Sequence, residues 1–148
     1  MKIEKVFLTF ICLVCILNSD VIRNNAKEIV TDTKTNLMWQ DNDDAKTLQK
    51  NWYEAIEYCK QLKIQDIEQW RLPTIQELFT ITDSERQYPS IKKEFKNIEN
   101  SDYWTITTEP ESQDNAWGVC FSGNDGSWNE KNDPHHVRCV KNIAIDNK

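Results

Sequence analysis

The order of secondary-structure signals along the chain constrains its fold more than any other feature. Short strand-like segments come first, two helical segments follow, and from Asp102 the sequence becomes rich in aromatic and β-branched residues. Strands and helices that are grouped in this way, instead of alternating, are typical of an antiparallel sheet with helices set against it. No internal repeat divides the 148 residues. The order therefore predicts one α+β domain, with two helices packed on short antiparallel sheets.

Two segments have a clear helical pattern. Residues 51–62 repeat apolar side chains at spacings of three and four, and the segment begins with an asparagine, which is a suitable N-cap. This pattern turns Cys59 toward the core. A second helix is expected over residues 75–81, where Thr74 and Glu77 have the spacing of a capping box.

The strands are expected on both sides of the helices. A hairpin is predicted over residues 27–31 and 37–40, with Asn36 in the left-handed conformation at its turn. Three further strands are expected over residues 103–108, 116–121 and 136–140. Residues 122–135 are dense in turn-forming residues and are predicted to be a long loop. All three glycines of the chain fall within nine residues, so positive φ angles are expected mainly there.

Three polar segments are expected to be irregular. Residues 20–26 are predicted to be a flexible lead-in to a domain that spans residues 27–142, and residues 143–148 are predicted to be a tail. Residues 41–50 are acidic, but they lack the glycine and the closing glutamate of a calcium loop. A solvated loop is predicted for this segment.

Residues 1–19 are expected to be a signal peptide. A weakly basic start precedes twelve apolar residues, 6–17, and this run is shorter than the about 20 residues that a membrane span needs. A buried N-terminal helix and a lipoprotein signal at Cys12 or Cys15 are the alternatives. The mature chain is predicted to have no stable membrane span and to be periplasmic, secreted or held at the cell surface.

The net charge limits the classes of partner that the chain can bind, and the cysteine content limits the disulfides that it can form. The formal net charge of −6 argues against nucleic acid as a partner, because nucleic acids attract cationic surfaces. Of the five cysteines, Cys59, Cys120 and Cys139 lie outside the apolar run. One disulfide and one free thiol is the simplest outcome, and the sequence alone allows three pairings.

Several motifs together resemble the Lcl C-terminal-domain family, over about residues 27–141. They are Leu37-Met38-Trp39-Gln40, Tyr58-Cys59, Trp70-Arg71-Leu72-Pro73-Thr74, Tyr103-Trp104-Thr105, Ala116-Trp117 and Val137-Arg138-Cys139-Val140. The chain departs from the family pattern at Asn36, where a glycine is usual, and at Cys120. The resemblance implies a C-type-lectin-like fold, close to the formylglycine-generating-enzyme-like branch, in an exported bacterial protein.

The resemblance also implies a disulfide and a ligand surface. In that fold the first helix and the last strand are joined by a recurring disulfide, which implies the pair Cys59–Cys139 and leaves Cys120 free, as a buried apolar thiol. Ligands of that fold bind to the segments before the last strand, here residues 107–115 and 122–135. The candidate ligand-binding residues in them are Glu109, Asn124, Asp125, Trp128, Asn129 and Asn132. Trp128 as a packing residue is the alternative.

A calcium ion is the one cofactor that the motifs raise. Glu109-Pro110-Glu111 and Trp128-Asn129-Glu130 look like degenerate forms of the E-P-N and W-N-D elements of calcium-dependent lectins. The candidate Ca²⁺ ligands are Glu109, Glu111, Asn129 and Glu130. Each element departs from the pattern at its third residue, so ordinary acidic loops are the alternative.

No residue is expected to be catalytic. His135 and His136 are adjacent, so in a strand they would point to opposite faces. The predicted function is an exported recognition module that is not an enzyme and binds a glycan or a protein. The family's best-known ligand is a sulfated glycosaminoglycan, but Lys131 and Arg138 are the exceptions in segments that are mainly acidic, so that polyanion is not expected here. A structural or envelope-associated domain without a small ligand is the alternative.

Overall fold

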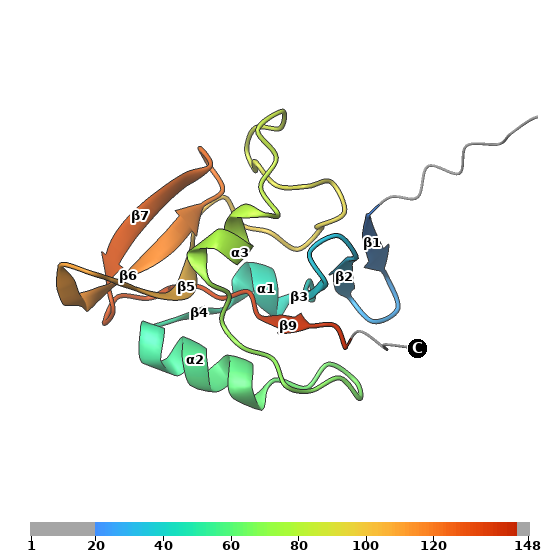
Figure 1. Ribbon diagram of the computed structural model, residues 1–148, viewed down its shortest axis with the longest axis horizontal. Coiled ribbons are helices and arrows are strands. Elements are labelled where there is room, and N and C mark those ends of the chain that lie inside the picture. The colour runs from blue at the N-terminus through green and yellow to red at the C-terminus, as the bar shows by residue number, and fades with distance from the viewer. Residues whose placement is uncertain (1–19, 145–148) are drawn as a thin grey trace, which may run out of the picture.

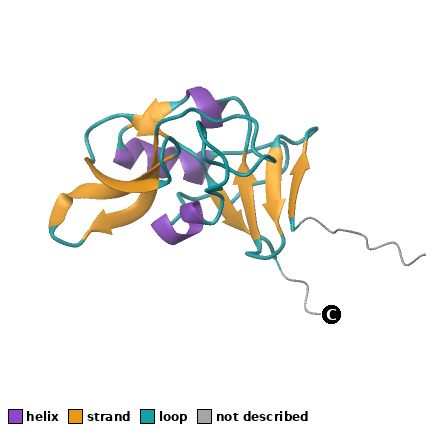
Figure 2. Ribbon diagram, turned by 90° about the horizontal axis from the view of Figure 1, so that it is seen from above, coloured by secondary structure: helices purple, strands orange, loops and turns teal. Residues whose placement is uncertain are grey.

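In the computed structural model, residues 20–144 form two β-sheets and three helices (Figure 1). The predicted signal peptide and the end of the predicted tail lie outside these described residues. Figure 2 shows the two sheets at opposite ends of the molecule, with helices and loops between them. This arrangement confirms the predicted α+β class. Within residues 20–144, no helix has the length and apolar character needed to cross a membrane.

The first sheet contains the predicted N-terminal hairpin. Its strands are β1 (Val21–Asn24), β2 (Ile29–Asp32), β3 (Leu37–Gln40) and β9 (Val140–Asn142), in the order β1-β2-β3-β9. Every neighbouring pair is antiparallel, and Asn36 has the expected left-handed backbone, with φ of 55°. The prediction of a flexible lead-in over residues 20–26 is wrong, because Val21 to Asn24 pair along β2.

The second sheet shows two differences from the predicted strands. It contains β4 (Gln49–Lys50), β8 (His135–His136), β5 (Asp102–Glu109), β6 (Ser112–Cys120) and β7 (Asp125–Glu130), in the order β4-β8-β5-β6-β7. The predicted loop over residues 122–135 contains the six-residue strand β7, which is antiparallel to β6. The single strand predicted over residues 136–140 is wrong. Residues 137–139 are a buried crossing between the two sheets, so β8 and β9 belong to different sheets.

The helices begin where the local signals predict. In α2 (Trp52–Gln61) the Asn51 side chain caps the first turn, and in α3 (Ile75–Phe79) both hydrogen bonds of the predicted capping box are present. The predicted solvated loop over residues 41–50 is wrong. It contains α1 (Asp44–Thr47) and β4, and its first residue, Asp41, is fully buried.

The core is divided by β5 and β6 into two clusters. Tyr103 and Val119 face the cluster that includes α3, whereas Trp104 and Ala116 face the cluster that includes α2. The second cluster holds the disulfide Cys59–Cys139, with a Cα–Cα distance of 5.5 Å. The pairing that the family resemblance implied is therefore confirmed.

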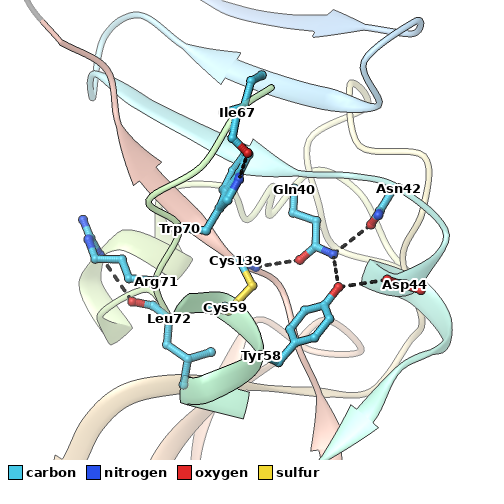
Figure 3. The surroundings of a disulfide bond; sticks show 10 residues. All are labelled: Gln40, Asn42, Asp44, Tyr58, Cys59, Ile67, Trp70, Arg71, Leu72 and Cys139. Carbon is cyan, nitrogen blue, oxygen red and sulfur yellow. Dashed lines mark hydrogen bonds between the residues drawn. A yellow bond between two sulfur atoms is a disulfide. The ribbon is translucent and has the colours of Figure 1, made fainter. Parts of the chain in front are cut away.

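Hydrogen bonds surround the disulfide (Figure 3). The Cys139 backbone N–H donates to Gln40 Oε1 at 3.0 Å, and Gln40 Nε2 donates to the Tyr58 hydroxyl oxygen at 2.8 Å. The Tyr58 hydroxyl in turn donates to Asp44 Oδ2 at 2.9 Å. This chain links β3, α1, α2 and the segment before β9.

The glycines do not supply the left-handed turns. None of the three has a positive φ, whereas Glu28, Asn36, Gln65, Gln69, Tyr88 and Asn124 do. The expectation from the glycine positions is therefore wrong. At Gly118 the requirement is space, because a Cβ atom there would lie 3.1 Å from the Tyr103 carbonyl oxygen across the sheet.

Candidate functional site

An exposed aromatic surface lies on β7 and its neighbours. Trp128 is 56% exposed and lies directly opposite the half-buried Trp117 of β6. Two residues earlier, a Cβ atom on Gly126 would lie 3.4 Å from the ring of Phe79, which is 36% exposed. Side chains two apart in a strand share a face, so Phe79, Trp117 and Trp128 lie on the α3 side of the sheet. These three residues are called the aromatic surface below.

The strand that carries Trp128 lies at the edge of its sheet. Among the described residues, β7 is the last strand of its sheet and pairs only with β6. The pairing is regular over six residues, from Asp125 to Glu130. Trp128 is therefore held on a paired strand, although the sequence placed it in a loop.

The structure divides the six candidate ligand residues into two groups. Asn124 and Asp125 lie where β7 begins, whereas Asn129, Asn132 and Glu109 lie toward its other end. At the strand rise of about 3.4 Å per residue, the two ends of β7 are about 17 Å apart. Trp128 lies between the groups, and one compact site does not hold all six residues.

Hydrogen bonds occupy part of the second group. Asn115 Nδ2 donates to Glu109 Oε2 at 3.0 Å, and Asn129 Nδ2 donates to Ser127 Oγ at 3.3 Å. Because neighbouring side chains in a strand alternate, Asn129 points away from the face that carries Trp128. The side chains of the predicted contact residues therefore lie on both faces of β7.

The four candidate calcium ligands lie at the same end of this sheet. Glu109 ends β5, Glu111 follows in the turn, and Asn129 and Glu130 end β7. Across residues 20–144, no three His, Cys, Asp or Glu side chains are grouped closely enough to hold a metal ion. Calcium binding stays a prediction.

Lys131 lies at the same end of the sheet as the candidate calcium ligands. Its Nζ donates to the Gln113 carbonyl oxygen at 2.7 Å and to Thr108 Oγ1 at 3.2 Å, and it lies 4.3 Å from the centre of the Trp52 ring. The side chain is buried. Its charge would repel a calcium ion bound at the neighbouring carboxylates.

A polar pocket of about 260 Å³ lies beside the start of β7. It is formed by two segments of the chain, and its lining residues are Ser84, Arg86, Gln87, Tyr88, Ser90, Ser122, Gly123 and Asn124. Ile91 and Phe95, which follow the first segment, are buried in the core. The sequence does not reveal the pocket, because the two segments are more than 30 residues apart. Its local signals are Tyr88, an aromatic residue in a polar stretch, and Asn124, which was a candidate ligand residue.

The two histidines pack against aromatic rings of β5. His136 stacks on Tyr103 and His135 meets the edge of Trp104, so the two rings lie on opposite sides of β5. Burial lowers the pKa of both histidines, which favours their neutral forms.

Cys120 is half-buried, and its sulfur lies 2.9 Å from Ser122 Oγ. The expected fully buried apolar thiol is therefore not found.

The two most specific motifs of the family resemblance have structural roles. In the first, Arg71 donates to both carboxylate oxygens of Glu77 at 2.7 Å and to Asn142 at 2.6 Å, which ties α3 to β9. In the second, Arg138 is fully buried and donates to Asp41 Oδ1 at 2.9 Å. Arg138 is therefore not a surface cation of the ligand segments.

Comparison with known families places the chain in one family. The sequence model of the Lcl C-terminal domain matches residues 28–141, a range that contains both motifs and the disulfide. No curated protein matches the chain closely enough to count as a relative. Because the matched range covers most of the 148 residues, the chain belongs to the Lcl C-terminal domain family.

Proposed function

We propose that this protein is an exported recognition module, without catalytic activity, that binds a glycan along β7. The observation that carries the proposal is the exposed aromatic surface around Trp128. Indole and phenyl rings pack well against the apolar face of a sugar ring. Large aromatic side chains that cluster on the solvent-exposed surface often mark a binding site.

The strand and its rim supply the other requirements of such a site. The six paired residues of β7 hold Trp128 in one place, so little ordering is needed when a ligand binds. Glu130, two residues after Trp128 on the same face of the strand, offers carboxylate acceptors for sugar hydroxyls. A rigidly held aromatic ring beside polar side chains is suited to binding a ligand, and it offers no group for catalysis.

Charge supports a neutral glycan. The chain carries a net charge of −6, and Glu130 lies on the same face of β7 as Trp128. A polyanionic glycan would be repelled there, and the buried Lys131 and Arg138 do not face it. A neutral glycan fits this surface better than a sulfated one.

Export is supported by two features of the chain. The apolar run over residues 6–17 has the length of a signal peptide. The disulfide Cys59–Cys139 is a bond that persists in oxidising compartments. The periplasm, the cell surface and the medium all meet this requirement.

The test is a glycan array with the intact protein, followed by calorimetry on the strongest neutral oligosaccharide, with and without Ca²⁺. Trp128→Ala is expected to weaken binding about tenfold or more, because it removes the stacking face. Tyr53→Ala is the matched control, since Tyr53 is 53% exposed on α2 and is not part of the aromatic surface. Unchanged affinity in Trp128→Ala would rule out this site. Tighter binding with Ca²⁺ would support the calcium prediction.

The structural alternative has a simple discriminator. A ligand that binds only the native state must raise the melting temperature. If no sugar on the array raises it and no sugar is retained, a domain without a small ligand is the better assignment.

A further inference from the structure

We propose that the polar pocket beside β7 is a subsite for one neutral sugar ring, which is a terminal residue of the glycan bound along the strand. The inference rests on the proposed function and adds a second point of contact to it. Asn124 lines the pocket, and Asp125, the next residue, begins β7. The pocket therefore leads directly onto the strand that carries Trp128.

The lining has the chemistry of a sugar subsite. Three serine hydroxyls, two side-chain amides, a phenol and a guanidinium line the pocket, and none of the lining residues is acidic. Hydroxyl and amide groups both donate and accept hydrogen bonds, as sugar hydroxyls do. The exposed Glu85 and Asp125 next to the pocket would repel an anionic substituent. A neutral ring matches this lining.

Size limits the occupant. The volume of about 260 Å³ is below the roughly 300–1,000 Å³ of most small-molecule sites. One ring fits in this space, whereas the rest of a longer glycan must lie outside it.

Tyr88 is held at the mouth of the pocket by an unusual backbone. Its side chain is 69% exposed, and its φ of 52° lies in the left-handed region, which a bulky residue rarely adopts. The neighbouring Ser90 fixes this conformation, because its N–H donates to the Phe121 carbonyl oxygen at 2.8 Å and its own carbonyl accepts from Asp83 N–H at 3.1 Å. Backbone strain of this kind concentrates at binding sites. Here it presents a flat aromatic ring where a sugar would enter.

Asn124 supplies an unused hydrogen-bonding group. Its φ is 59°, and its Oδ1 atom is buried with no donor among the described residues. Buried polar atoms without a partner are rare in folded proteins. Rotation of this amide toward a ligand breaks no hydrogen bond of the oxygen, and a sugar hydroxyl can supply the missing donor.

Distance sets the length of the complete ligand. Asp125 and Trp128 are three residues apart in β7, which corresponds to about 10 Å. A glycan that fills the pocket and also stacks on Trp128 must therefore be an oligosaccharide. A methyl monosaccharide is expected to occupy the pocket alone.

The test uses amide chemical shifts of the intact, ¹⁵N-labelled protein during titration with methyl glycosides of neutral hexoses and N-acetylhexosamines. Shifts are expected in the amides of residues 84–88, 90 and 122–124. Tyr88→Ala and Asn124→Ala are each expected to weaken this binding about tenfold. Tyr88→Phe keeps the ring and is expected to retain most of the affinity, and Tyr53→Ala is the control for loss of an exposed ring. Unchanged melting temperatures would show that the variants are folded.

The outcomes separate this inference from the proposed function. If no glycoside shifts the pocket amides, or if Tyr88→Ala and Asn124→Ala bind as the wild type does, the subsite is wrong. Loss of oligosaccharide binding in Trp128→Ala would then still support binding along β7. If the pocket amides shift while Trp128→Ala keeps full oligosaccharide affinity, the subsite stands and the contact at Trp128 is wrong.

Discussion

Arg138 connects parts of the chain that are far apart in sequence. Its guanidinium donates to Asp41 Oδ1, to the Gln40 carbonyl oxygen at 2.6 Å and to the Asn97 carbonyl oxygen. Arg23 of β1 forms a second ion pair with Asp41. Burial lowers the pKa of Arg138 to about 10, which leaves the group protonated at neutral pH. Asp41 is thus the shared anion of two arginines, and this role explains why an acidic residue lies in the core.

Replacing this anion is the first prediction at the residue scale. Asp41→Asn keeps the size of the side chain but leaves a buried Arg138 without its counter-charge. Breaking a buried pair in this way costs about 3–5 kcal/mol of folding free energy. The measurement is urea-induced unfolding. Asp43→Asn is the control, since Asp43 is exposed in the same segment and its side chain makes no capping hydrogen bond. Equal unfolding midpoints for the wild type and Asp41→Asn would contradict the role of Asp41.

At the scale of elements, local signals predicted the helices and long-range pairing decided the strands. The caps of α2 and α3 lie within three residues of the groups they bind, so the sequence contains the whole motif. β7 has the composition of a turn, and it is a strand because β6 pairs with it along its whole length. The flexible lead-in was wrong for the same reason, because β2 pairs with β1.

The capping box gives a prediction for a single element. Thr74→Ala removes the oxygen that accepts from the Glu77 N–H at 3.2 Å, and it is expected to cost about 1 kcal/mol of stability. Gln76→Ala, at an exposed position of the same helix, is expected to change stability by less than about 0.5 kcal/mol. Chemical denaturation of both variants tests the difference. Equal effects would mean that α3 is held by packing and by Arg71 instead of by its cap.

At the scale of the whole molecule, the sequence indicated one residue of the proposed ligand surface but not the arrangement of that surface. Trp128 was a candidate contact and proves to be exposed, but the residues proposed with it lie along both ends and both faces of β7. The polar pocket was missed because it exists only after residues 84–90 meet residues 122–124. A site that is assembled by tertiary packing leaves little pattern in either segment.

The disulfide joins two segments that are far apart in sequence, and its removal gives the last prediction. Cys59 and Cys139 are 80 residues apart, so the bond restricts most of the unfolded chain, and it is expected to contribute about 4 kcal/mol. Replacing both cysteines by alanine is therefore expected to lower the melting temperature strongly. Cys120→Ser should change it little, because the Cys120 thiol is free and half-buried. Mass spectrometry of peptides from the unreduced protein should find Cys59 linked to Cys139. A linkage between Cys59 and Cys120 would contradict the structure, in which Cys59 is bonded to Cys139 and the Cys120 thiol is free.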